Sequence, residues 1–361
     1  MTTRAAFAER TAAAVPALAH HAVPGAREAV YYAGLDDLEA LPVTDAPNAY
    51  AVTASIKRAV LNTVTAQTNA PGVHFTGAAG DAVLSAPSSY LADLLREGHR
   101  RRAWRHAHVH ARLRHTSAFA VLARAKPAAR LDLAGAWRQT AATLHGPARD
   151  WMPQAQRPTE WTPLLAAADW MTTDARRRLA DAIAEAADRV TDAPARLADW
   201  SDRQDLARVG ANTAGWRTLA LAEHGIELAA PYLDNGVVRA CLAVPADQRG
   251  APGQYKPLLE AAFTATGVVP DFVLARTTKG GFNALAYAGL TSNAPVLREL
   301  LGPSSQLAAL GLVTEKPVMP WRRCARGSPD GRAPGGPPRR PTLPTWSATT
   351  TTRAPAAGTS G

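Results

Sequence analysis

The chain has 361 residues, of which 47% are hydrophobic, and carries a formal net charge of +10 at pH 7. This size and composition indicate a globular protein with a substantial core, and its two cysteines exclude a disulfide framework and a cysteine-based zinc site. The charge does not define a nucleic-acid-binding protein. Seven arginines and one aspartate lie from Trp321 onward, which leaves +4 for residues 1–320, and no nucleic-acid-binding motif accompanies them.

Membrane segments are not expected either. No apolar run approaches the roughly 18 residues that a membrane helix needs. Residues 1–22 are rich in alanine, but charged residues interrupt them where a secretory signal would keep an unbroken apolar core. We therefore expect a cytoplasmic protein.

The first elements in chain order are a helix over residues 4–19, a strand over 28–32 and a helix over 49–67. A short apolar run then begins at Val73 and predicts a buried strand, which ends in a glycine-bearing turn and leads to Asp81 in the first turn of a helix. Open α/β sheets bind nucleotides at such a junction, where backbone N–H groups favour phosphate and a carboxylate can hold Mg²⁺. The same pattern also describes an ordinary strand–helix junction without a ligand.

The middle of the chain is predicted to be helical, with breaks at prolines. A helix over 82–95 is followed by the arginine-rich segment 96–115, in which Trp104, Val109 and Leu113 predict one packed side. Its arginines form either a solvated helix face or a site for an anionic partner, which would be the acidic part of a peptide substrate or nucleotide phosphates.

The C-terminal part changes in composition. Helices are expected over 117–223, over 282–301 and on to about 312, whereas proline, glycine, arginine, serine and threonine dominate from residue 317. Such a composition predicts disorder. We therefore divide the chain into a folded domain over 1–316 and a disordered tail over 317–361.

Three further blocks carry a family resemblance: Ala-Pro-Tyr-Leu-Asp-Asn at 230–235, Tyr-Lys-Pro-Leu-Leu at 255–259 and Val-Leu-Ala-Arg-Thr-Thr-Lys-Gly-Gly-Phe at 273–282. Together with the turn at 76–81, in this order and spacing, they resemble the synthetase domain of the asparagine synthase family. Within that family the chain is most similar to the macrolactam synthetases that close lasso peptides. The resemblance covers residues 15 to 315.

The resemblance implies an α/β fold of the adenine nucleotide alpha hydrolase-like (ATP pyrophosphatase) type, with a parallel sheet and a large helical portion. It also implies that ATP, with Mg²⁺, activates a carboxylate as an acyl-adenylate, and that an amine then attacks to form an amide. The implied site residues are Lys279 and Asp81 for catalysis, Asp81 for the metal, and Thr76, Gly77, Gly80 and Lys256 for the nucleotide. For Lys279 the alternative is a solvated loop lysine.

Departures from the family pattern predict an incomplete domain. The phosphate-binding loop of the family, of the Ser-Gly-Gly-x-Asp-Ser type, has no match in residues 1–19. Ala78 replaces an expected acidic residue and Ala79 a glycine. We therefore expect a sheet that lacks its first strand and loop, in an N-terminally truncated chain, and the sequence leaves open whether this chain is active on its own.

Three functions are compatible with these observations. The first is lasso peptide macrolactam formation, with a precursor peptide as substrate and a leader-peptide-binding or protease protein as partner. The second is asparagine synthesis, or a related amidotransferase reaction, on a small-molecule carboxylate. The third is a non-catalytic remnant that binds a peptide or a partner subunit through the basic helix around Arg101.

Overall fold

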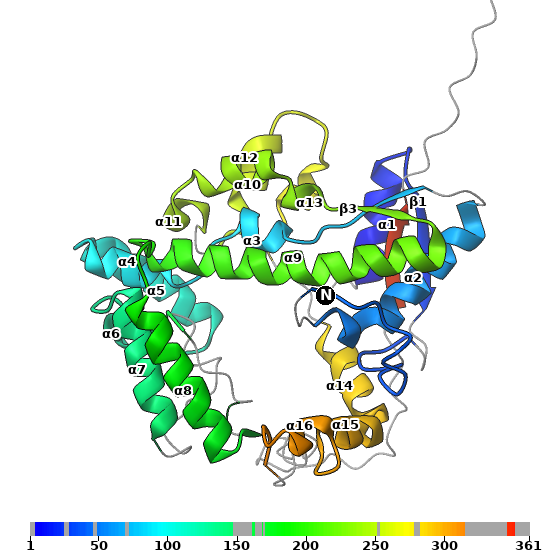
Figure 1. Cartoon of the computed structure of the whole chain (residues 1–361). Helices are drawn as coiled ribbons and strands as arrows, with labels where there is room; N and C mark the ends of the chain where they lie inside the picture. Colours follow the sequence, from blue (N-terminus) through cyan, green and yellow to red (C-terminus); the bar gives the residue numbers. More distant parts are fainter. Residues whose placement is uncertain are drawn as a thin grey trace, which may run out of the picture.

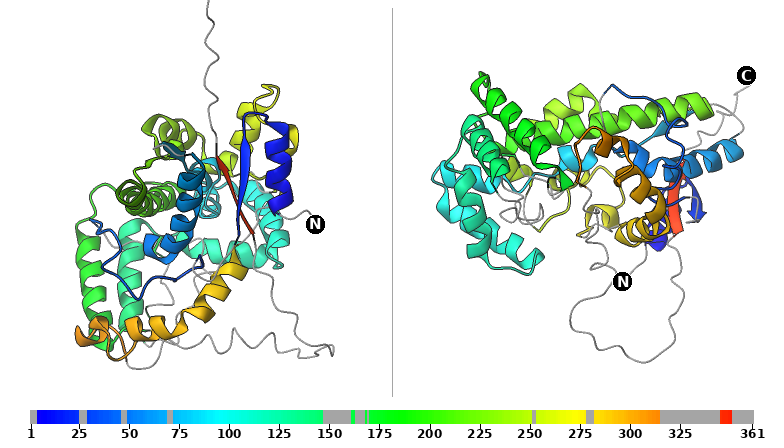
Figure 2. Two further views of the ribbon diagram at one scale, coloured as in Figure 1. Left: turned by 90° about the vertical axis from the view of Figure 1, so that its right-hand side faces the viewer. Right: turned by 60° about the horizontal axis from the view of Figure 1, so that its bottom comes forward.

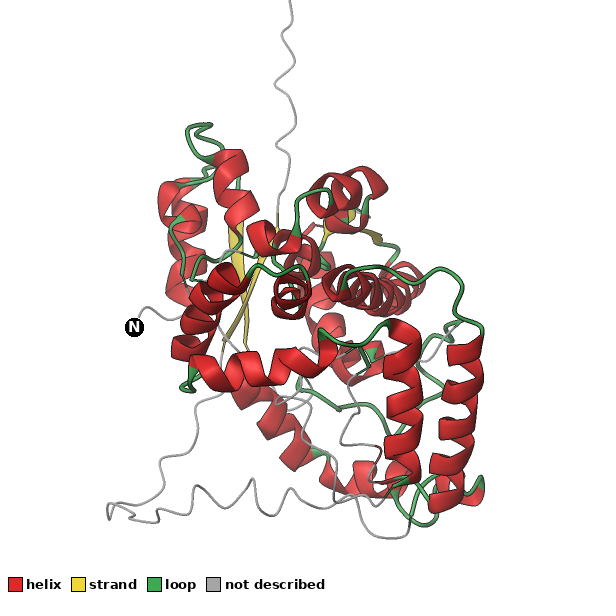
Figure 3. Cartoon of the chain, turned by 90° about the vertical axis from the view of Figure 1, so that its left-hand side faces the viewer, coloured by secondary structure: helices red, strands yellow, loops and turns green. Residues whose placement is uncertain are grey.

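The computed structural model describes residues 4–24, 29–45, 49–68, 72–146, 161–162, 168, 170–250, 253–277, 282–314 and 345–350. Helices make up most of this part of the chain, and the few strands are short (Figure 1, Figure 3). The structure is thus a mostly helical α/β protein, as the sequence predicted.

The elements of the first half run from residue 4 to residue 145. They are α1 (Arg4–Ala14), β1 (Ala19–Pro24), η1 (Tyr50–Thr53), α2 (Ala54–Thr68), β2 (Val73–Phe75), α3 (Gly80–Leu84), α4 (Tyr90–Arg96), α5 (Arg100–Leu113), α6 (Ala118–Ala128) and α7 (Leu133–His145).

The elements of the second half begin at residue 173. They are α8 (Thr173–Asp188), α9 (Leu197–His224), β3 (Glu227–Ala229), η5 (Pro231–Leu233), α10 (Asn235–Leu242), α11 (Ala246–Arg249), α12 (Pro257–Phe263), α13 (Asp271–Leu274), α14 (Asn283–Ser292), α15 (Ala294–Leu301), α16 (Gln306–Ala309) and β4 (Thr345–Thr350).

Two strand pairs occur in the described part of the chain. β2 and β3 are parallel, with Val73 opposite Glu227 and Phe75 opposite Ala229. β1 and β4 are antiparallel, and Figure 2 shows them side by side. The predicted strand over 28–32 is wrong where the structure describes it, because residues 29–32 form bends and turns.

The C-terminal tail contributes one of these strands. For residues 345–350 the structure has β4 where composition predicted disorder, because this stretch, Thr-Trp-Ser-Ala-Thr-Thr, lacks proline and glycine and is rich in residues that favour strands. The other residues of the tail lie outside the described part of the chain. In the described residues, no helix is both long and apolar enough to cross a membrane.

The helix α9 connects the two main hydrophobic clusters (Figure 1). Its first turn packs into the cluster of α4, α5, α6 and α7 through Leu197 and Ala198. Its last turns pack against η1, α2 and β3 through Leu219 and Ala220. The buried carboxylate of Asp93 accepts hydrogen bonds from the N–H groups of Leu197 (2.7 Å) and Ala198 (2.9 Å) and thereby caps the start of α9.

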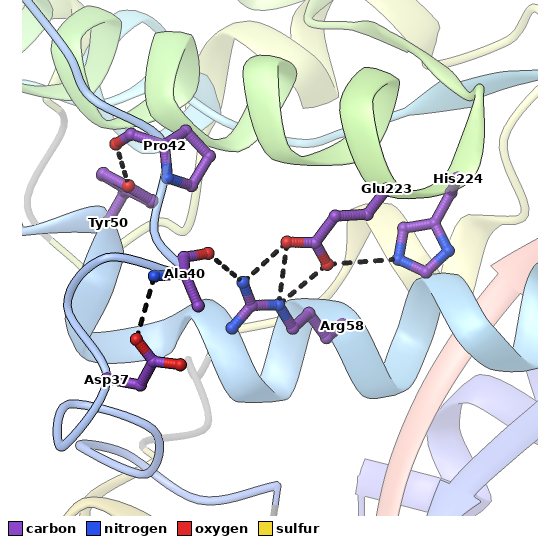
Figure 4. A network of polar contacts seen from close by, with 7 residues as sticks. All are labelled: Asp37, Ala40, Pro42, Tyr50, Arg58, Glu223 and His224. Atoms are coloured by element: carbon purple, nitrogen blue, oxygen red, sulfur yellow. Dashed lines mark hydrogen bonds and ion pairs between the residues drawn. The ribbon is translucent and has the colours of Figure 1, made fainter.

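A polar network fixes the other end of α9 (Figure 4). The guanidinium of Arg58, on α2, forms an ion pair with Glu223 at 2.6 Å and donates a hydrogen bond to the carbonyl of Ala40 at 2.8 Å. The hydrogen bond from Arg58 is the main reason that the pKa of Glu223 is lowered. This network joins α2 and the loop before it to the end of α9, immediately ahead of β3.

The helix α5 buries a different face from the one predicted. Its buried residues are Ala103, His106, Ala107 and Ala111, whereas Trp104 and Leu113 are exposed. Small alanine side chains allow α5 to approach its neighbours closely, so the indole of Trp104 remains at the surface. The prediction failed because it followed the largest apolar side chains.

Candidate functional site

The turn after β2 stands at the carboxyl edge of the parallel strand pair. The Thr76 N–H donates to the carbonyl of Ala229 at 2.9 Å and so extends the pairing by one residue. The Thr76 hydroxyl accepts from the N–H of Ala78 at 3.3 Å, and Ala79 adopts a left-handed conformation with φ +66° just before α3. Ala79, which replaces the glycine of the family pattern, therefore occupies a conformation that favours glycine.

Gly80 allows the side chain of Tyr232 to approach this turn closely. A Cβ atom on Gly80 would lie 3.1 Å from two ring carbons of Tyr232, which is in the Ala-Pro-Tyr-Leu-Asp-Asn block. Gly80 is buried, whereas Gly77 is exposed. The structure thus places Gly80 at a packing contact and leaves Gly77 at the open surface.

Asp81 and Lys256 meet at this turn. The Lys256 ammonium lies 3.2 Å from a carboxylate oxygen of Asp81, and the side chains are 18% and 51% exposed. Asp81 is in the first turn of α3, and Lys256 immediately precedes α12 in a left-handed conformation with φ +57°. Two residues predicted from separate sequence blocks are therefore in direct contact.

A group of aromatic and cationic side chains continues from Lys256. The Lys256 ammonium lies 5.2 Å from the centroid of the Tyr255 ring. The Arg276 guanidinium lies 5.9 Å from the same ring and 4.5 Å from that of Phe7 on α1. The third block, which contains Arg276, is thereby attached beside the Asp81 turn. Lys279 lies outside the described residues.

Asp234 fixes the start of α10, which packs against the helix that carries Asp81. Its carboxylate accepts hydrogen bonds from the N–H groups of Gly236 (2.7 Å) and Val237 (3.3 Å) and caps α10. α10 and α12 both contact α3. These contacts place α10 and α12 beside the helix that carries Asp81.

Arg249 is a residue that the sequence analysis missed. Its side chain is 1% exposed and forms a buried ion pair with Asp202 on α9. It also donates to the carbonyls of Ala82 (3.1 Å), Val83 (3.4 Å) and Ser85 (2.5 Å) at the end of α3. Arg249 therefore fixes the helix that carries Asp81, and no local sequence signal distinguishes it from a surface arginine.

The donor set fits a metal ion that arrives with a nucleotide. In the described residues there is no group of three or more His, Cys, Asp or Glu side chains that could hold a metal. Mg²⁺ in nucleotide sites is usually held by one or two carboxylates together with phosphate oxygens and water. The exposed Asp81 carboxylate beside an open turn can supply one such ligand.

These features define a class: an α/β protein whose candidate site stands at the carboxyl edge of parallel strands, where open sheets bind nucleotides. The chain belongs to the asparagine synthase family, whose model, described as "Asparagine synthase", matches residues 5–323. Membership indicates an ATP-dependent, amide-forming ligase, and the family assignment made from the sequence is confirmed. Comparisons with curated proteins and with solved structures gave no match.

Proposed function

We propose that the chain activates a carboxylate with ATP and joins it to an amine, and that the product is the macrolactam ring of a lasso peptide. The observation that carries the proposal is the contact between Asp81 and Lys256 at the strand edge, in a chain of the asparagine synthase family. The choice of a lasso peptide rests on the resemblance of the four sequence blocks to that branch.

The Asp81–Lys256 pair suits a site that exchanges partners. An ion pair with one carboxylate half-exposed contributes only about 0–1 kcal/mol to stability. The entry of ATP can therefore separate the two groups at little cost. Asp81 would then hold Mg²⁺, which neutralises phosphate charge, while the Lys256 ammonium would face a phosphate or substrate oxygen.

The backbone of the turn would contribute further to phosphate binding. The N–H group of the exposed Gly77 and the hydroxyl of the half-buried Thr76 can donate to anionic oxygens, whereas the Thr76 N–H is already paired with Ala229. Gly80 would act indirectly by seating Tyr232. Together they would hold the nucleotide so that the carboxylate substrate attacks in a fixed orientation.

Lys279 completes the proposal. Three residues span at most about 11 Å of extended chain, and Arg276 contacts the ring of Tyr255, next to Lys256. The chain length therefore allows the Lys279 ammonium to reach the site. There it would stabilise the negative charge that develops on the reacting phosphate and carbonyl oxygens.

Titration calorimetry and pyrophosphate exchange test the proposal. MgATP should bind the wild-type chain and should fail to bind Asp81→Asn, while Asp188→Asn, the same change at an exposed site on α8, should bind normally. ATP–pyrophosphate exchange that requires a peptide with an acidic side chain supports macrolactam formation. Exchange that requires free aspartate overturns it in favour of asparagine synthesis. Failure of the wild-type chain to bind ATP overturns the ligase proposal and leaves a non-catalytic binding protein.

A further inference from the structure

A groove between α4, α5 and α6 lies outside the candidate nucleotide site. It has a volume of about 910 Å³ and is open to the surface. Arg100, Arg101 and Trp104 line it from α5, and Phe119 and Lys126 line it from α6. The other lining residues include Arg96 at the end of α4 and Arg130 just after α6.

The charge of this groove is strongly one-sided. Five cationic side chains line it, and the described lining residues include no carboxylate. Arg96, at the end of α4, donates hydrogen bonds to the carbonyls of Ala128 (3.1 Å) and Ala129 (3.2 Å) at the end of α6, so it holds these two walls together.

The four other cations are available to a partner. They are all exposed, and none forms an ion pair with a described residue: Arg100, Arg101, Lys126 and Arg130. Both α5 and the end of α6 thus present positive charge to whatever lies in the groove.

The start of α5 carries more positive charge than its neighbouring carboxylates, Asp247 and Glu97, balance. The helix begins with three arginines and has no acidic residue in its first turn. Cations at a helix N-terminus oppose the helix dipole, whereas an anion there is favoured by about 0.3–1 kcal/mol. Arg102 is paired with Asp247 at 2.6 Å, which leaves Arg100 and Arg101 without such compensation. A bound carboxylate would supply it.

The remaining lining is apolar and aromatic. Phe119 is 74% exposed and Trp104 is 36% exposed. Their rings pack edge to face, with centroids 4.8 Å apart and planes at 69°. An exposed aromatic pair rimmed by charge is typical of a binding surface, because rings left in water contribute binding free energy when a partner covers them.

We propose that this groove binds an acidic polypeptide segment that carries an aliphatic or aromatic side chain. Carboxylates of the segment would pair with the cations of α5 and α6, and its apolar side chain would cover Phe119. Single-stranded nucleic acid fits less well, because successive bases stack in parallel on aromatic faces, whereas these two rings cross at 69°. The inference does not depend on the proposed ligase activity, since it needs no nucleotide.

Calorimetry with the full chain and unlabelled synthetic peptides tests this inference without ATP. The probe is a short peptide in which glutamates flank a Leu-Phe pair, and the comparison peptide has glutamine in place of glutamate. We expect the acidic peptide to bind at least about tenfold more tightly, and binding to weaken with added salt, since exposed charges are screened beyond about 10 Å at 0.1 M salt. Equal affinity for the two peptides would overturn the proposal.

Variants locate the site. Arg101→Glu and Lys126→Glu should each weaken binding by about tenfold, and Phe119→Ser should do the same without charge change. Arg112→Glu is the matched control: it is exposed on α5, outside the groove, and about 16 Å along the helix from Arg101. It should leave affinity within about twofold.

Two outcomes would refute the assignment of this groove. One is equal loss of peptide binding in Arg112→Glu and Arg101→Glu, since that would mean general attraction to a basic protein. The other is oligothymidylate binding more tightly than the peptide, with the same groove variants abolishing it, since that would identify a nucleic-acid site. Circular dichroism of each variant identifies any unfolded protein, and Phe119→Ser, at a largely exposed position, keeps the test valid if a charge reversal unfolds the chain.

Discussion

Replacing Arg249 by methionine removes the side chain that holds α3 in place. Methionine fills a similar volume without charge. It leaves three carbonyls at the end of α3 without their donor, and it leaves the Asp202 carboxylate, 5% exposed, without its partner. The Asp202 carboxylate and the Val83 carbonyl are buried, so water cannot replace their contacts.

The expected loss of stability follows from the buried carboxylate. Breaking a buried ion pair by removing one partner costs about 3–5 kcal/mol, and each buried acceptor left unsatisfied adds about 1–3 kcal/mol, without strict additivity. We expect the free energy of unfolding to fall by about 4 kcal/mol at pH 8. Asp81, carried by the same short helix, should shift, so ATP affinity should fall as well.

The pKa of Asp202 determines how the difference in stability between wild type and Arg249→Met changes with pH. Burial raises the pKa of Asp202 to about 6, against the attraction of Arg249, which lowers it. A folded-state pKa above the unfolded value of about 3.9 means that stability is lost as pH rises between these values. Without Arg249 the pKa of Asp202 rises further, so the loss continues to higher pH. The gap between wild type and Arg249→Met should therefore widen from pH 5 to pH 8.

Urea unfolding at a series of pH values measures this gap. Adding Asp202→Asn to Arg249→Met should remove the pH dependence of the gap and restore part of the stability, because no charge then remains to be buried. The part of the stability that the double variant does not recover measures the contribution of the hydrogen bonds from Arg249 to the α3 carbonyls. A gap below about 1 kcal/mol, or one that is the same at pH 5 and pH 8, would refute the role assigned to this pair.

Three further predictions concern single side chains. Asp81→Asn should abolish Mg²⁺-dependent ATP binding in calorimetry and change the free energy of unfolding by less than about 1 kcal/mol, because its ion pair is half-exposed. Ala79→Gly should raise stability by up to about 1 kcal/mol, because glycine adopts φ +66° without strain. Gly80→Ala should lower stability by about 1–3 kcal/mol, because its Cβ atom would press against the Tyr232 ring. Urea unfolding in which both variants change stability in the same direction would contradict this. Burial lowers the pKa of His110 to about 4, so about 3 kcal/mol of stability should disappear as pH falls from 6.5 to 4; an identical pH profile for His110→Gln would disprove it.

Local chemistry explains which parts of the fold were predictable. The run from Val73 and the turn up to Asp81 carry their own signal, because a short apolar run followed by glycines is readable within a few residues. The predicted burial of this strand is wrong, since Val73 is 52% and Phe75 67% exposed. The strand β3 was not predicted. It has only three residues, and its pairing with β2 depends on a segment far away in the chain.

The contact between Asp81 and Lys256 required more than local patterns. No periodicity connects these positions, and only the family resemblance suggested that they share a site. Arg249 shows the opposite case. It is as important to the position of α3 as any predicted residue, yet buried arginines have no sequence signature, since most arginines are exposed. The proposed roles of all the predicted site residues remain predictions: Thr76, Gly77, Gly80, Asp81, Lys256 and Lys279.

The length of α9 places its two ends in different hydrophobic clusters. With a rise of about 1.5 Å per residue, its 28 residues span roughly 42 Å, from the Asp93 cap to the Arg58–Glu223 contact. Neither hydrophobic cluster can open without releasing one end of this helix. We therefore expect weakening of either cluster to speed amide hydrogen exchange at the end of α9 that packs against it.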